Sequence, residues 1–170
     1  MPVKIARVTI ELAVALLLTG CISTVVGTVP VVTQGPAADV EVVTSTLKKR
    51  EVVWPDESVR FWVYDNKEQQ VLGSELLTLE QPRKTFRMAT QPEYKFMVIK
   101  VSPVMGGAYT CKAETVLTLA PGQRYRVLFD FDINYNEYRK STCASEIQQL
   151  DSQGRVVKRI PPSSFSMSPA

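Results

Sequence analysis

The chain has 170 residues, of which 45% are hydrophobic and 22% are charged, with a formal net charge of +3. This length supports one domain with a real hydrophobic core. The small positive charge lacks the concentrated basic excess of nucleic-acid-binding domains, so we do not expect a nucleic-acid partner. Histidine is absent, which removes the commonest general base and the commonest metal ligand.

The first twenty residues have the three-part layout of a secretory signal. Lys4 and Arg7 precede an apolar run over residues 12–18, and the small residues Thr19 and Gly20 follow it. The run is too short to cross roughly 30 Å of hydrocarbon, which takes about 20 residues. We therefore interpret residues 1–20 as an export signal that is removed.

The signal ends in Leu18-Thr19-Gly20-Cys21, a sequence that resembles the lipobox of bacterial lipoproteins. The resemblance implies cleavage before Cys21 and acylation of that cysteine, and two or more acyl chains make a stable membrane anchor. Ile22 stands where enterobacterial members of the family carry the aspartate that retains them at the inner membrane. The resemblance therefore implies the outer membrane, with the protein facing the periplasm.

Two segments lack the pattern of packed structure. Residues 21–38 carry no charge and are interrupted by glycine and proline, which predicts a lipidated cysteine followed by a flexible tether spanning roughly 20 to 25 Å. A strand at residues 29–32 along a sheet edge is the alternative. Residues 161–170 are polar and rich in proline, which predicts a disordered tail. The domain is thus expected to cover residues 39–160.

Within residues 39–160 the hydrophobic pattern has the period of two that is typical of strands. Val59, Phe61 and Val63 alternate with polar or aromatic neighbours, and the same alternation recurs over residues 96–101, 113–119 and 125–136. Short strands separated by glycine and proline predict a mainly β fold. We expect an antiparallel β-sandwich of immunoglobulin-like or transthyretin-like architecture, with at most one short helix.

Turn residues and one ambiguous segment refine this expectation. Ala120-Pro121-Gly122-Gln123 places proline and glycine where a type II turn requires them, which predicts a hairpin with the long strand that follows. Residues 151–154 predict a second hairpin. Residues 75–80 could form the short helix or a strand.

The cysteines left after Cys21 are Cys111 and Cys143. Their even number, in an oxidising compartment, predicts a disulfide. Cys111 is in phase with Leu117 and Leu119 and Cys143 with Ile147, so both thiols should point between the sheets. A redox-active pair or a zinc site is disfavoured, because the two are far apart in sequence and no histidine is present.

Catalytic and metal-binding patterns are weak. Residues 130–141 resemble a calcium loop, but Tyr135 replaces the glycine and Ser141 replaces the closing glutamate, so we expect no metal site. Asp130 and Asp132 share a strand face about 6.6 to 6.8 Å apart, a spacing that a carboxylate-based hydrolase could use. No serine has a catalytic partner. We expect neither an enzyme nor a cofactor.

The aromatic residues are the remaining candidates for a binding surface. Tyr135, Tyr138, Arg139 and Lys140 form a polar stretch with two aromatics and two cations, which suggests a partner surface. Trp62 could belong to such a surface, but we expect it in the core. The favoured function is a non-enzymatic interaction or structural module that binds the membrane through Cys21 and contacts an envelope protein. The alternatives are a small-ligand or cell-wall glycan binding domain and a carboxylate-based hydrolase.

Overall fold

The computed structural model describes residues 28–45, 47, 57–90, 92–104, 107–132, 134 and 140–169. The described residues form ten strands and no α-helix. The strands are Ala37–Val43 (β1), Val59–Asp65 (β2), Val71–Leu77 (β3), Arg83–Ala89 (β4), Glu93–Val104 (β5), Gly107–Thr118 (β6), Arg124–Asp132 (β7), Thr142–Leu150 (β8), Val156–Ile160 (β9) and Ser164–Pro169 (β10).

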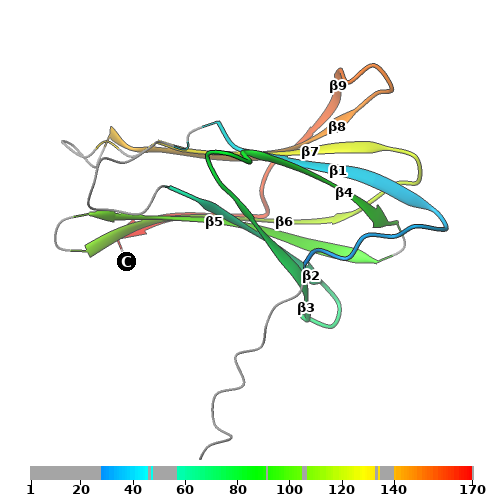
Figure 1. Cartoon of the computed structure of the whole chain (residues 1–170), viewed down its shortest axis with the longest axis horizontal. Coiled ribbons are helices and arrows are strands. Elements are labelled where there is room, and N and C mark those ends of the chain that lie inside the picture. The colour runs from blue at the N-terminus through cyan, green and yellow to red at the C-terminus, as the bar shows by residue number, and fades with distance from the viewer. Residues whose placement is uncertain are drawn as a thin grey trace, which may run out of the picture.

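The strands make two five-stranded sheets, which Figure 1 shows as an upper and a lower layer. Sheet A has the order β4-β1-β7-β8-β9 and sheet B the order β10-β6-β5-β2-β3. The predicted β-sandwich is therefore confirmed. One part of the prediction is wrong, because β1 and β7 pair in parallel and sheet A is mixed rather than purely antiparallel.

The core lies between the two layers and follows the alternation of the strands. Val59, Phe61 and Val63 of β2 point inward and are fully buried, as their spacing predicts. The Phe61 ring stacks on Phe96 of β5 at 5.8 Å between centroids and on Phe86 of β4 at 6.1 Å. These rings join the two sheets, because β4 belongs to sheet A while β2 and β5 belong to sheet B.

Two turns form as predicted, but the strands on either side of the first do not pair with each other. Gly122 has φ +70° and the Gln123 amide donates to the Ala120 carbonyl at 3.2 Å, so the predicted turn is present. However, β6 lies in sheet B and β7 in sheet A, so no hairpin forms there. Turn residues specify a reversal of the chain, but they do not specify which sheet edge the next strand joins. The β8–β9 hairpin is confirmed, with Gly154 at φ +80°.

Residues 75–77 belong to a strand, which decides between the two interpretations of residues 75–80. The C-terminal segment is also a strand: β10 pairs with β6, and Phe165 and Met167 lie opposite Ala113 and Cys111. The predicted disordered tail is therefore wrong for residues 164–169. The polar, proline-rich composition of the tail was a poor guide. An edge strand needs only backbone hydrogen bonds and alternate apolar side chains, and Ser-Phe-Ser-Met supplies both.

The second half of the predicted tether is packed onto the domain. Val29 is 2% exposed and belongs to the core, and the Val32 amide donates to the Arg87 carbonyl on β4 at 2.8 Å. Thr28 and Val29 cross β3 at Gly73 so closely that a Cβ there would lie 2.5 Å from the Thr28 carbonyl oxygen. We call residues 28–36 the strap. The expectation of a flexible tether is therefore wrong for the strap, because Val29 is buried in the core and the Val32 amide is hydrogen bonded to β4.

The predicted disulfide joins Cys111 and Cys143, with 6.2 Å between the Cα atoms. It links the two layers, because Cys111 lies on β6 and Cys143 on β8. The β7–β8 pairing sets Cys143 opposite Phe131, and this register places the cysteine where the bond can form. Most of the chain reversal between β7 and β8, residues 135–139, lies outside the described residues.

We predict that Gly73→Ala destabilises the domain by about 1 to 3 kcal/mol, because backbone atoms of the strap occupy the space that the new methyl group needs. Urea unfolding of the purified chain measures the change. Ser74→Ala, at the next position of β3, is the matched control and should have little effect. Equal stability of Gly73→Ala and the unchanged chain would contradict the packing of the strap.

We also predict that reduction of Cys111–Cys143 lowers the free energy of unfolding by up to about 3.7 kcal/mol, the loop-closure value for a sequence separation of 32 residues. Thermal unfolding with and without reductant measures the loss. A double variant, Cys111→Ala with Cys143→Ala, should reproduce it and become insensitive to reductant. Two titratable thiols in protein purified without reductant would show that the bond is not made.

Candidate functional site

Most of the site residues named from the sequence lie in parts of the chain that the structure does not describe. Cys21, Tyr135, Tyr138 and Arg139 lie outside the described residues. Lys140 is described and lies exposed just before β8. The proposed partner surface around residues 135–140 therefore stays a prediction.

The structure instead displays aromatic and aliphatic side chains on the outer face of sheet B. Trp62 points outward from β2 and is half-buried, so the expectation that it fills the core is wrong. It points outward because Val59, Phe61 and Val63 form the inward face of β2, and Trp62 lies on the opposite face with Arg60 and Tyr64. We call the part of this outer face over β2, β3 and β5 the sheet B surface; its members are Arg60, Trp62, Tyr64, Leu76, Lys95, Met97, Ile99 and Val101.

Two cations lie over the aromatic rings of this surface. The Arg60 guanidinium is 5.6 Å from the Trp62 ring centroid, and the Lys95 ammonium is 4.7 Å from the Tyr64 centroid. The Trp62 and Tyr64 rings are themselves 6.4 Å apart. The cations are held at the surface by the rings, in a geometry that contributes about 0.5 to 1 kcal/mol at an exposed site.

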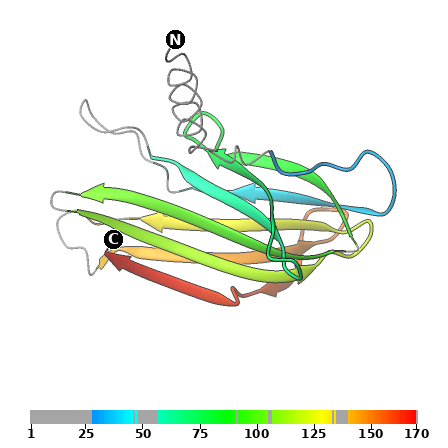
Figure 2. The same ribbon diagram turned by 90° about the horizontal axis from the view of Figure 1, so that it is seen from below.

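An open hollow runs beside Trp62 between β2, β3 and β5. Its lining residues are Ser58, Arg60, Trp62, Leu76, Ile99 and Val101. Val101 is 52% exposed and Leu76 is 37% exposed, so apolar side chains face solvent here. Figure 2, which is turned to look from below, shows β2 and β5 running side by side across this layer. Aromatic residues and arginine beside exposed aliphatic residues are typical of protein binding surfaces.

Two ionisable groups on or beside the sheet B surface, Tyr64 and Glu114, have shifted pKa values. Burial raises the pKa of the Tyr64 phenol above its ordinary value, and nearby Lys112 partly opposes that shift. The hydrogen bond from Lys112 lowers the pKa of the Glu114 carboxyl. At neutral pH the phenol is therefore neutral and the carboxylate charged.

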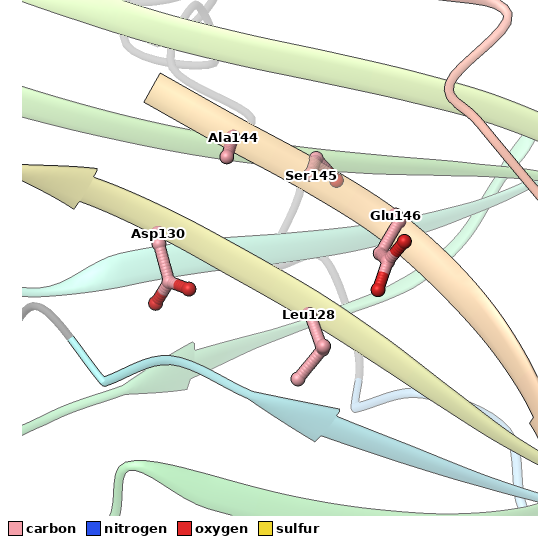
Figure 3. A pocket seen from close by; sticks show the side chains of 5 residues that line it. All are labelled: Leu128, Asp130, Ala144, Ser145 and Glu146. Carbon is pink, nitrogen blue, oxygen red and sulfur yellow. The ribbon is translucent and has the colours of Figure 1, made fainter. Parts of the chain in front are cut away.

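The outer face of sheet A holds the second candidate, an open depression between β7 and β8. Figure 3 shows Asp130 and Glu146 directed into it from the two strands, with Leu128 between them. Asp130 accepts hydrogen bonds from the Ser45 hydroxyl at 2.6 Å and the Ser45 amide at 3.1 Å. Glu146 accepts hydrogen bonds from Gln148 and Arg159 on its own side of the sheet.

This arrangement does not match the carboxylate pair of a hydrolase. The pair named from the sequence was Asp130 and Asp132, whereas the acid that shares the depression with Asp130 is Glu146. Both carboxylates in the depression already accept hydrogen bonds within the protein, and the depression is open to solvent. A glycosidase instead places two acids on either side of an enclosed bond.

A third polar cluster lies inside the sandwich and was missed from the sequence. Lys100 of β5 and Glu57 form an ion pair at 2.7 Å, and their side chains are 1% and 3% exposed. The Lys100 ammonium also donates to the Phe131 carbonyl at 2.8 Å. The signal was available, because Lys100 is in phase with the inward residues Phe96 and Val98. The pair fills the interior and connects sheet B to β7, which makes its role structural.

Two other kinds of feature are absent from the described residues. Among them, no group of three or more histidine, cysteine, aspartate or glutamate side chains could hold a metal ion. The same part of the chain has no helix with the length and apolarity needed to cross a membrane.

We predict that Lys100→Met lowers the free energy of unfolding by about 3 to 5 kcal/mol, because it leaves the Glu57 carboxylate buried without this cation. The double variant Lys100→Met with Glu57→Gln should regain much of that loss, since it removes both charges. Urea unfolding of the single and double variants gives the coupling. Additive losses would contradict a direct interaction between the two residues.

Comparison with known proteins gives no relative for this domain. The chain matches no protein-family model, no curated protein and no solved structure. Its function is therefore inferred from the arrangement of its own residues.

Proposed function

We propose that the chain is a bacterial lipoprotein anchored through Cys21, and that its sandwich domain is a non-enzymatic binding module of the cell envelope. The sheet B surface is its binding surface. The observation that carries the proposal is the outward display of Trp62, Leu76 and Val101 beside two cations. The layered fold supports an immunoglobulin-like or transthyretin-like architecture, with the parallel β1–β7 pair as its departure.

The location is supported by two independent features. The sequence before Cys21 has the layout of an export signal ending in a lipobox. The Cys111–Cys143 disulfide suits a compartment outside the cytoplasm, where such bonds form and persist. Ile22 in place of aspartate supports the outer membrane, with the domain in the periplasm.

Binding is favoured over the alternatives by the composition of the two outer faces. A cleft lined with tyrosine and aspartate would favour a carbohydrate ligand. The hollow beside Trp62 is lined instead by three aliphatic residues together with Ser58, Arg60 and Trp62. The depression on sheet A has acids that are already hydrogen bonded. A rigid face with a large aromatic side chain and an arginine is what protein interaction surfaces use.

We predict that Cys21→Ala moves the full-length chain from the membrane to the soluble periplasmic fraction, because the acyl chains supply the anchoring. A photo-crosslinking residue at Val101 should capture a membrane component in the unchanged background and lose that product with Cys21→Ala. Fractionation after a salt wash and analysis of the crosslinked products measure both effects.

The matched position is Leu128, which faces outward on sheet A. A crosslinker there should give little product. Retention of Cys21→Ala in the washed membrane would contradict the anchor, and equal crosslinking from Leu128 and Val101 would contradict the assignment of the binding surface.

A further inference from the structure

The strap fixes where the anchor joins the domain. Thr28 crosses β3 at Gly73, and Val29 is inserted into the core. The chain is therefore part of the domain from Thr28 onward, and it joins the domain at β3, the outermost strand of sheet B. The neighbour of β3 is β2, which carries Arg60 and Trp62.

The distance available between anchor and domain follows from the sequence. Six residues lie between Cys21 and Thr28, so the link has seven Cα–Cα steps. Even a fully extended chain of that length reaches only about 25 Å. An acylated Cys21 would lie at the membrane surface, so β3 stays close to that surface in every arrangement of the chain.

The side of the domain near this point is apolar. Val31 of the strap is 57% exposed, and Val71 and Leu76 of β3 are 41% and 37% exposed. Trp62 continues the patch onto β2. Tryptophan and tyrosine beside lysine and arginine are the residues that favour the boundary between headgroups and acyl chains.

The charge that lies over these apolar residues is positive. Arg60 and Lys95 sit above the rings of the sheet B surface, while the acids at its border, Glu93 and Glu114, accept hydrogen bonds from neighbouring side chains. Ion pairs are more numerous on the outer face of sheet A, where Arg83–Glu41 lies at 3.3 Å, Arg126–Glu41 at 2.6 Å and Arg159 contacts Glu146. On the outer face of sheet B, Lys112 pairs with Glu114 at 2.6 Å, while Arg60 and Lys95 lie over rings.

From these observations we infer that the sheet B surface docks on the anionic phospholipid headgroups of the membrane in which Cys21 is anchored. The inference rests on the proposed lipid anchor and names the occupant of the proposed binding surface. The short link between Cys21 and Thr28 makes the contact intramolecular, with an effective concentration in the millimolar range. A face whose own dissociation constant for the membrane is about millimolar or lower is therefore docked for much of the time.

Tryptophan fluorescence in vesicles tests the contact directly. The full-length acylated chain with Trp54→Phe, which leaves Trp62 as its only tryptophan, is reconstituted into vesicles of phosphatidylethanolamine and phosphatidylglycerol. Lipids brominated near the headgroup should quench the fluorescence of Trp62 several-fold more strongly in these vesicles than in phosphatidylcholine vesicles. High salt should remove most of that difference, because it screens the attraction between cations and headgroups.

Two controls separate docking from mere proximity. A chain with Trp54→Phe, Trp62→Phe and Leu128→Trp carries its single tryptophan on the outer face of sheet A, and it should be quenched weakly. Arg60→Glu with Lys95→Glu should reduce the quenching of Trp62 several-fold. Arg124→Glu with Lys158→Glu on sheet A changes the net charge equally and should leave the quenching of Trp62 in place.

The outcomes distinguish this inference from the proposed function. Equal quenching of tryptophans at positions 62 and 128, or quenching independent of anionic lipid, overturns the docking while the chain still floats with the vesicles. Crosslinking of Val101 to a protein instead of lipid in the native envelope also overturns it, although the binding surface would stand. Failure of the acylated chain to float with the vesicles would overturn the anchor and the docking together.

Discussion

The constraint on which the fold depends is that each strand presents only alternate side chains to the space between the sheets. On β5 this alternation places Lys100 inside, in line with Phe96 and Val98, and a buried ammonium is costly unless it is paired. Glu57 and the Phe131 carbonyl supply that pairing. The register of β5, the position of Glu57 before β2 and the approach of β7 are therefore coupled through one side chain.

The sequence predicts well whatever depends on neighbouring residues, such as the alternation of β2, β5 and β7 and the turn at Gly122. It predicts the Cys111–Cys143 disulfide because parity and compartment agree. It fails where the partner is distant in sequence. The strap and β10 look unstructured by composition, and only the open side of the sandwich and the exposed edge of β6 give them a place to pack. The parallel β1–β7 pair has no local signal.

The candidate surface could be predicted only in part, for a related reason. β2 alternates Val59, Phe61 and Val63 with Arg60, Trp62 and Tyr64, so both of its faces could be buried. What decides the orientation is the fit of Phe61 between Phe86 and Phe96, which belong to strands elsewhere in the chain. Trp62 then faces outward as a consequence of packing on the opposite side of the sheet.

The two outer faces of the sandwich hold their cations in different ways. On sheet A, Arg83 and Arg126 pair with Glu41, and Arg159 pairs with Glu146. On sheet B, Arg60 and Lys95 lie over aromatic rings, and Lys112 pairs with Glu114. Gly73 lets the strap approach β3 closely from the core side, so the chain enters the domain at β3, next to β2, which carries the second kind of face. In the proposed docking, the point where the strap enters therefore helps to determine which face the membrane meets.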